Sequence, residues 1–357
     1  MISILTRRVP APWLIGAIVL IPAGVSVAWW YYWPTYHRRQ LLAAAERAIE
    51  SDKPAEARES LEKLLKHSKV QKSQPAEEAR VHYLYAQVLR RLGEGDNAWE
   101  HLRIAVEGGL PEPEGRREYA LLEAGGNFSL AENVLRRVLD DYPNDSEVLQ
   151  VLAQGYVSVG RWPDAEKIYT RWLEVQPDRM ETLLARGNAR LEAGGLDQAA
   201  ADFREVLLRS PNHFQARLSL AQCLLNNLKV DEAQAELDRC HAMLPARSEP
   251  LVGLAACALE RGDLDKAQTL TKEALALDGN SRAALTVLGI IHLRRQRYDL
   301  AIPIFEAVVR LSPRDKQAHL NLAQAFHKQG DLEKAKEHES IFQKLDTSPP
   351  TGIVRNP

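Results

Sequence analysis

The chain has 357 residues, of which 26% are charged, and a formal net charge of -2 at pH 7. This mixed-sign balance disfavours nucleic-acid binding, which needs a strongly basic surface. A single compact core is unusual at this length, whereas an array of repeats buries a continuous core however many repeats it stacks. The three cysteines (Cys223, Cys240 and Cys257) form no CxxC pair, so we expect small core residues rather than zinc ligands or disulfide partners.

The first predicted element is a transmembrane helix over residues 13–33, which follow a short flank (residues 1–12) and include no charged residue. About twenty-one helical residues extend roughly 31 Å, which matches the hydrocarbon thickness of a bilayer. Tryptophans stand at both ends of this run, where aromatic rings prefer the headgroup region. The alternative is a signal peptide cleaved after residues 26–28, but cleavage would leave an exposed aromatic N-terminus. We therefore expect a single-pass anchor.

Basic residues on the two sides of this span are nearly balanced, with Arg7 and Arg8 before it and Arg38, Arg39 and Arg47 after it. The positive-inside rule therefore gives almost a tie. An N-terminal basic cluster before a first apolar run resembles a signal anchor, which favours the extracytoplasmic side for the rest of the chain.

The stretch from Ser146 to Pro177 contains two amphipathic runs separated by Gly160, a pattern that predicts one helix, a tight turn and a second helix. Its second run contains an alanine where a large side chain would block close contact between the two helices. This small residue returns at a constant step of 34 residues. The series is Ala131, Ala165, Ala199, Ala233, Ala267, Ala301 and Ala335.

With this period the chain resembles the tetratricopeptide repeat family. The resemblance covers nearly everything after the span and implies an all-α solenoid over residues 36–345, a right-handed superhelix of about nine helix-turn-helix repeats. The repeats are expected near residues 38–71, 79–111, 112–145, 146–179, 180–213, 214–247, 248–281, 282–315 and 316–345.

Two early segments depart from the regular pattern. Residues 69–78 are polar and interrupted by proline, which predicts an inserted loop. The third repeat has a poor first helix, because Pro111, Pro113 and Gly115 crowd its start, and it is the expected soft joint of the array.

Later departures are smaller. Leu228 and Gln296 replace the glycine of the turn in two repeats. Glu339 stands where earlier repeats have an aromatic residue, which indicates a final repeat that shows water a polar face. Residues 346–357 are rich in proline and polar residues and are expected to be a disordered tail.

No motif of a known enzyme is present. The chain contains no phosphate-binding loop, HExxH pair, GxSxG elbow or EF-hand loop, so we expect neither catalysis nor a cofactor. The nearest approach to a metal-binding pair is His319 and His327, which stand two helical turns apart and too far from each other to bind one ion.

The resemblance implies a concave groove, lined by the first helix of each repeat, that takes an extended peptide or a partner's helix. The matching positions are Tyr83, Gln87, Arg90, Arg91, Arg116, Arg117, Gln150, Gln154, Asn188, Gln222 and Gln324. The trio of lysine, asparagine and arginine that forms the family's carboxylate clamp is not found here, so binding of chaperone C-termini is not implied.

Four of these residues are amides at the same place in their repeats: Gln87, Gln154, Asn188 and Gln222. An amide both donates and accepts, so a row of amides can pair with a peptide backbone without demanding a sequence. The alternative is that a water-facing position is simply polar.

Charge along the predicted groove shifts from basic near the span to acidic in the middle of the chain. The basic residues are Arg80, Arg90, Arg91, Arg116 and Arg117, and the acidic ones are Glu147, Glu181, Glu192, Glu249 and Glu260. Such a shift could orient a long partner, or it could belong to an ordinary solvated face.

These features predict a membrane-tethered scaffold that binds a protein or peptide in its groove, for assembly or quality control of a membrane-associated or envelope complex. The alternative is a substrate-recognition or regulatory subunit for a separate enzyme such as a glycosyltransferase. The sequence identifies neither the partner nor the oligomeric state.

Overall fold

The computed structural model describes residues 36–68 and 74–347. The predicted span (residues 13–33) and residues 348–357 of the predicted tail lie outside these ranges. Among the described residues, no helix combines the length and the apolar composition that a membrane crossing requires.

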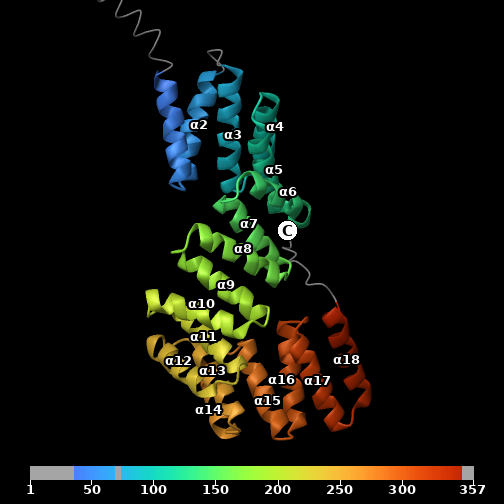
Figure 1. The fold of residues 1–357 in the computed structure, drawn as a ribbon. Coiled ribbons are helices and arrows are strands. Elements are labelled where there is room, and N and C mark those ends of the chain that lie inside the picture. Colours follow the sequence, from blue (N-terminus) through green and yellow to red (C-terminus); the bar gives the residue numbers. More distant parts are fainter. Residues whose placement is uncertain (1–35, 69–73, 348–357) are drawn as a thin grey trace, which may run out of the picture. The chain divides into compact units, whose positions relative to one another are not determined.

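The described residues form helices joined by turns, which confirms the predicted all-α solenoid of helix pairs (Figure 1). They divide into two compact units, Met1–Pro143 and Asn144–Pro357, which are called the N-terminal and C-terminal units below. The N-terminal unit contains a helix over residues 36–50, then α2 (Pro54–Ser68), α3 (Pro75–Arg91), α4 (Gly95–Glu107), α5 (Glu112–Gly126) and α6 (Phe128–Asp141).

The C-terminal unit contains six successive helix pairs in the predicted register. They are α7 (Ser146–Ser158) with α8 (Trp162–Val175), α9 (Met180–Glu192) with α10 (Leu196–Arg209), α11 (Phe214–Asn226) with α12 (Val230–Met243), α13 (Ser248–Glu260) with α14 (Leu264–Leu277), α15 (Arg282–Arg294) with α16 (Tyr298–Leu311), and α17 (Lys316–Gln329) with α18 (Leu332–Thr347). From α9 onward, the first helix of each pair also packs against the second helix of the pair before it.

The periodic alanines lie where the sequence places them. All seven are essentially inaccessible to solvent, from Ala131 in α6 to Ala335 in α18. The first helix of each pair has a small residue at the matching position. This residue is glycine where the side chain that packs against it is phenylalanine. A Cβ atom on Gly187 would lie 2.7 Å from Cε1 of Phe203, so only glycine admits that ring.

The turns within the pairs, except the one between α5 and α6, share one backbone conformation. Gly160 and Gly194 have φ values of 70° and 84°, a region that favours glycine. Leu228 and Gln296 adopt the same region, with φ values of 58° and 61°. Asp52, in the turn before α2, does so too with a φ of 53°, so among the described residues the repeat geometry imposes this conformation on three that have a Cβ atom.

The first helix of the third repeat is a correction to the sequence analysis. It was expected to be poor, yet α5 is a regular helix of 15 residues. Pro113 lies in its first turn, where the missing N–H would have no helical partner. Gly115 is buried, and a Cβ atom there would lie 3.3 Å from Cγ2 of Val106, so this glycine allows α5 to approach α4 closely.

The start of α3 and the end of α18 differ from the boundaries expected from the sequence by a few residues. Helix α3 begins at Pro75, so residues 75–78 of the predicted loop are helical. Helix α18 continues to Thr347, two residues into the predicted tail. Glu339 in α18 is exposed, in agreement with its interpretation as part of a polar cap.

Candidate binding groove

The first helices of four successive repeats, α9, α11, α13 and α15, lie side by side in the C-terminal unit, and each contacts the next. They line an open cavity of about 760 Å³, called the groove below, and most of its residues come from α11, α13 and α15. A cavity of this size is within the range of sites that hold a ligand.

The floor of the groove is apolar. Leu218 on α11 and Val252 on α13 occupy the same place in their repeats, and both are half-buried. Leu184 has this place on α9 but does not line the cavity, to which α9 contributes Leu191. Leu184 and Leu218 pack from one side on the core that contains Phe203. Half-buried apolar side chains of this kind offer area that a partner can remove from water.

Three predicted amides, Gln154, Asn188 and Gln222, are exposed on α7, α9 and α11. Gln222 lines the groove, and its Nε2 donates to Oδ1 of Asn226 at 2.8 Å. Asn188 Oδ1 accepts a long hydrogen bond of 3.5 Å from Oγ of Ser219. The remaining two predicted amides of this unit differ, because Gln150 is half-buried on α7 while Gln324 is exposed on α17.

Tyr83 and Gln87, predicted to face a partner, are buried in α3, with 4% and 8% of their surfaces exposed. Tyr83 interacts with Arg117 and Glu118 of α5, so this face of α3 packs against α5. Burial raises the pKa of Tyr83 to about 12, and its hydroxyl is hydrogen-bonded to Gln87. In the N-terminal unit the expected amide is therefore part of the core.

The four arginines predicted in the groove of the N-terminal unit bind other residues of the same unit. Arg90 donates from Nε to Oε1 of the fully buried Glu118 at 2.6 Å, and Arg117 lies 3.7 Å from the other oxygen of that carboxylate. Arg91 donates to the carbonyl oxygen of Ile49 at 2.9 Å.

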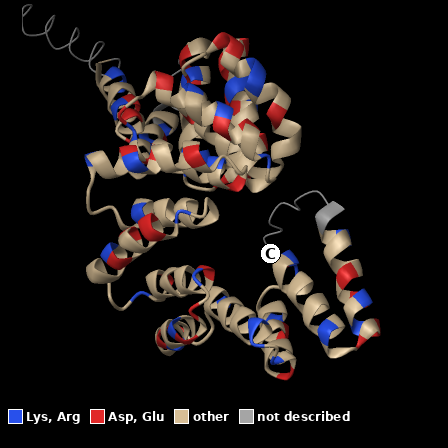
Figure 2. Ribbon diagram, turned by 60° about the horizontal axis from the view of Figure 1, so that its bottom comes forward, with Lys and Arg blue, Asp and Glu red and all other residues tan. Residues whose placement is uncertain are grey.

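Arg116 binds Glu112 and donates to Oδ2 of Asp141 at 3.0 Å. Acidic and basic residues are interspersed over the helices rather than segregated (Figure 2). The predicted basic end is consequently neutralised in large part by its own carboxylates.

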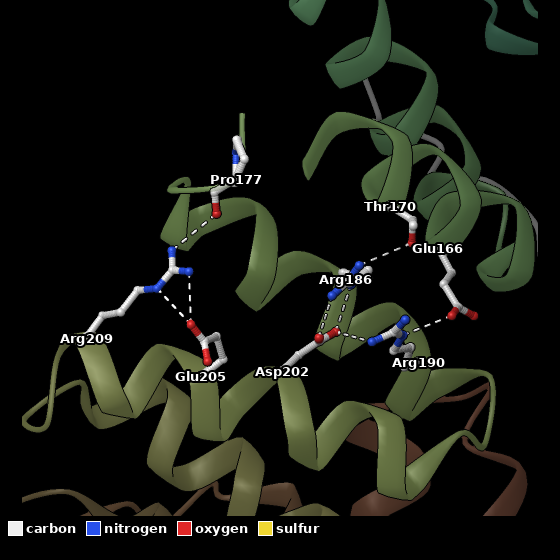
Figure 3. Close-up of polar contacts among 8 residues, drawn as sticks. All are labelled: Glu166, Thr170, Pro177, Arg186, Arg190, Asp202, Glu205 and Arg209. Carbon is white, nitrogen blue, oxygen red and sulfur yellow. Dashed lines mark hydrogen bonds and ion pairs between the residues drawn. The ribbon is translucent and has the colours of Figure 1, made fainter. Parts of the chain in front are cut away.

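A buried ionic network in the C-terminal unit was missed by the sequence analysis. Asp202 on α10 accepts from Arg186 at 2.7 Å and from Arg190 at 2.8 Å, both on α9 (Figure 3). Arg190 also donates to Glu166 at 2.9 Å, and Arg186 to Oγ1 of Thr170 at 3.4 Å, both on α8.

The signal for this network was present in the repeat register. Arg186 and Arg190 stand where the preceding repeat has the core residues Leu152 and Tyr156. Two arginines at core places require buried carboxylates nearby, because an unpaired buried charge is strongly unfavourable.

Two histidine pairs join the helices of a repeat at corresponding places. His82 and His101 approach with their Nδ1 atoms 2.7 Å apart, and His319 and His338 with theirs 3.0 Å apart. His319 Nε2 lies 3.1 Å from the carbonyl oxygen of Pro313, so Nε2 donates there and Nδ1 accepts from His338. His319 therefore pairs with His338 rather than with His327.

Metal ligation finds no support in the described part of the chain, where no three His, Cys, Asp or Glu side chains gather as an ion would require. The three cysteines are buried, as predicted, and burial raises the pKa of Cys223 and Cys240 to about 11. These thiols stay protonated at neutral pH and behave as small core side chains.

Models of the tetratricopeptide repeat match most of the chain. One matches residues 42–111, 184–245, 253–315 and 286–340, and a second matches residues 121–187. Together they cover well over half of the sequence. A search of curated protein sequences found no match.

Solved structures with a similar fold include a tetratricopeptide repeat protein from Parabacteroides merdae, with 15% identity and a TM-score of 0.49 over 82% of this chain and 99% of that one. A thermophilic protein of the same repeat type from Thermus thermophilus has 19% identity and a TM-score of 0.46 over 51% of this chain and 98% of that one. The human IFIT1 dimer with m7Gppp-AAAA has 19% identity and a TM-score of 0.49 over 76% of this chain and 69% of that one. These likenesses are too distant to indicate a ligand for this chain.

Proposed function

The chain belongs to the tetratricopeptide repeat family of protein-binding scaffolds, and on that premise we propose that it is a membrane-tethered scaffold whose groove holds a segment of a partner protein. The observation that carries the proposal is the exposure of Gln154, Asn188 and Gln222 on successive first helices, of which Gln222 lines the groove with its half-buried apolar floor. A peptide laid across these helices gains backbone hydrogen bonds from the amides and buries its side chains against the floor.

The tether is the apolar run over residues 13–33, which lies outside the described residues. Its length and flanking tryptophans support a single span. The signal-anchor pattern supports repeats on the extracytoplasmic side, where the scaffold assists assembly or quality control of an envelope complex.

A pull-down from detergent-solubilised membranes tests the proposal, with the full chain as bait. The test variant combines Gln154→Ala, Asn188→Ala and Gln222→Ala. We expect it to lose about 0.5–1.5 kcal/mol of partner affinity for each hydrogen bond removed. Its melting temperature should change little, because these three side chains are exposed.

The matched control combines Gln198→Ala and Asn212→Ala, which remove exposed amides from α10 and from the turn that follows it. The control should bind the partner as the parent does. Equal affinity of the parent and the triple variant would reject the amide row as the binding surface, and recovery of an enzyme such as a glycosyltransferase would favour the regulatory alternative.

A further inference from the structure

A second cavity, of about 990 Å³, lies in the N-terminal unit. It is lined by α4, α5 and α6, where the first helix α5 packs against both second helices (Figure 1). The proposed partner groove belongs to first helices of the C-terminal unit, so it does not account for this cavity. The surface that the three helices present around it is called the α4–α6 face below.

The centre of the α4–α6 face is apolar and partly exposed. Val106 on α4 and Tyr119 on α5 line the cavity with 52% and 46% of their surfaces exposed. Trp99 on α4 contacts Tyr119 edge to face, with the ring centroids 5.1 Å apart, and so orients that ring. Ordered aromatic and aliphatic side chains favour an interface, because their exposed area can be removed from water with little further loss of freedom.

The charged residues that line the cavity balance one another. Three are glutamates and three are arginines. Four of the six form exposed pairs on their own helices, Arg103 with Glu107 and Arg116 with Glu112. The remaining two have opposite signs, Glu100 on α4 and Arg137 on α6. Both are exposed, and neither has an ion-pair partner among the described residues.

Glu100 and Arg137 are placed so that two copies of the face complement each other. A two-fold axis that lies in the plane of the face and runs along the helices sets α4 of one copy opposite α6 of the other. Glu100 of each copy then faces Arg137 of the other, so the same contact forms twice. Glu100 is the sixth residue of α4 and Arg137 the tenth of α6, a difference of about 6 Å along the helices that an arginine side chain can span.

The size of the face limits the strength of such a contact. The three helices have 13, 15 and 14 residues. They are therefore about 20 Å long, and at a spacing of about 8–10 Å they cover roughly 500 Å². A standard interface covers about 800 Å² on each partner. A dimer through this face is therefore weak, and anchoring of both copies in one membrane would raise their effective concentration.

We propose that the N-terminal unit binds a second copy of this chain through the α4–α6 face, as a two-fold dimer. Val106 and Tyr119 of both copies form the apolar centre, and two ion pairs between Glu100 and Arg137 flank it. A second copy suits this face better than a strongly acidic or basic partner, because such a partner would meet as many like charges as opposite ones. The dimer does not depend on the amide row of the C-terminal unit.

Charge reversal tests the dimer directly. Sedimentation velocity of the full chain in detergent micelles would follow its mass from about 1 to about 100 µM, the range suited to a weak interface. We expect the parent to become dimeric as the concentration rises. Glu100→Arg alone and Arg137→Glu alone should each weaken the dimer at least about tenfold, because each turns two attractive contacts into two repulsive ones.

An equimolar mixture of these two variants is the decisive sample. In a mixed dimer both contacts again join opposite charges, so the mixture should dimerise as the parent does although neither variant does so alone. The matched controls, Glu50→Arg and Lys66→Glu, change the net charge equally at exposed positions outside the cavity. Each should dimerise as the parent does.

The apolar centre has its own variant. Val106→Asp should also weaken the dimer at least about tenfold, because the contact would bury a carboxylate without a partner. Leu130→Asp is the control on α6, where the leucine is 65% exposed and does not line the cavity. It should leave the dimer unchanged.

Each contrary result removes the dimer without touching the proposed function. A parent that stays monomeric at about 100 µM overturns the proposal, since even a weak interface associates at that concentration. Dimerisation of the single charge variants as strong as the parent's places the contact elsewhere on the chain and overturns it as well. Single variants that are monomeric both alone and in the mixture overturn the two-fold arrangement. The pull-down through the groove tests the scaffold in all three cases.

Discussion

Some buried positions of the repeats hold charged residues, and the repeat pattern alone does not identify the residues that pair with them. Asp202 is nearly inaccessible, yet it compensates two arginines that replace a leucine and a tyrosine of the preceding repeat. Buried ion pairs of this kind seldom add stability relative to a well-packed apolar core, but the loss of one partner is costly. Replacing Asp202 together with its two arginines should therefore cost less stability than replacing Asp202 alone.

Asp202→Ala is expected to destabilise the C-terminal unit by about 2–4 kcal/mol, because Arg186 and Arg190 then lack their shared carboxylate. Thermal unfolding followed by circular dichroism measures the loss. Asp197→Ala on the same helix is the control and should cost under about 1 kcal/mol, since that side chain is largely exposed.

The concerted variant Arg186→Leu with Arg190→Tyr and Asp202→Ile copies Leu152, Tyr156 and Ile168 of the preceding repeat. It should be about as stable as the parent. A triple variant less stable than Asp202→Ala would contradict the view that the network substitutes for an apolar core.

The histidine pairs make stability depend on pH. Burial lowers the pKa of His82 and of His101, and for His82 the neighbouring His101 adds to the effect. Glu78 and Glu100 oppose the shifts without reversing them. The folded state thus keeps neutral imidazoles, while the unfolded chain binds protons near its usual pKa of about 6.5. Stability is therefore complete above about pH 6.5 and falls as the pH drops below it.

We expect His82→Leu with His101→Ile to reduce the loss of stability between about pH 7.5 and about pH 5.5. Urea unfolding at the two pH values measures it. Part of the loss of stability at low pH should remain in this variant, because burial also lowers the pKa of His338 in the second pair. His327→Leu, at an exposed position of α17, should leave the pH dependence unchanged.

The turn residue Leu228 has positive φ and is 73% exposed, so it contributes strain and little packing. Leu228→Gly should stabilise the chain by about 1 kcal/mol, because relief of the backbone strain outweighs the added freedom of glycine in the unfolded state. Thermal unfolding measures the gain. Leu244→Gly is the control at an exposed leucine with a φ of -138°, and it should destabilise instead.

At the scale of elements, the close approach of paired helices depends on the periodic alanine. Ala233→Phe in α12 should destabilise the array by about 1–3 kcal/mol, because its position is fully buried and overpacking forces the neighbouring helices apart. Thermal unfolding measures the loss. Ala235→Phe, on an exposed face of the same helix, should melt close to the parent. Equal melting of the two variants would show that the register is wrong.

At the scale of the whole molecule, we propose that the apolar run over residues 13–33 anchors the chain in a membrane. We expect the full chain to stay in the membrane pellet after washing with high salt and with alkaline carbonate, because a spanning helix binds far more tightly than an electrostatic attachment. Immunoblotting of the pellet and the supernatant measures this. A chain lacking residues 1–34 is the control and should appear in the soluble fraction, and release of the full chain by carbonate would contradict the span.

The sequence by itself determined the helix pairs, their register and the buried alanines of the C-terminal unit. The reason is that each repeat contacts only its neighbours, so a local pattern of small and large residues is enough to specify the local packing. The exposed places of Gln154, Asn188 and Gln222 followed from the same register.

Only the tertiary structure decided which polar residues of the first helices face solvent and which are buried. Gln87 shares its register with Asn188, yet it is buried beside Tyr83, which packs toward α5. Asp202 with its arginines and His319 with His338 are contacts between different helices, and each depends on how side chains orient across a particular helix crossing. Periodicity assigns a residue to a face of its helix, but the partner that meets this face comes from the neighbouring helices, and that is why these contacts were not predicted.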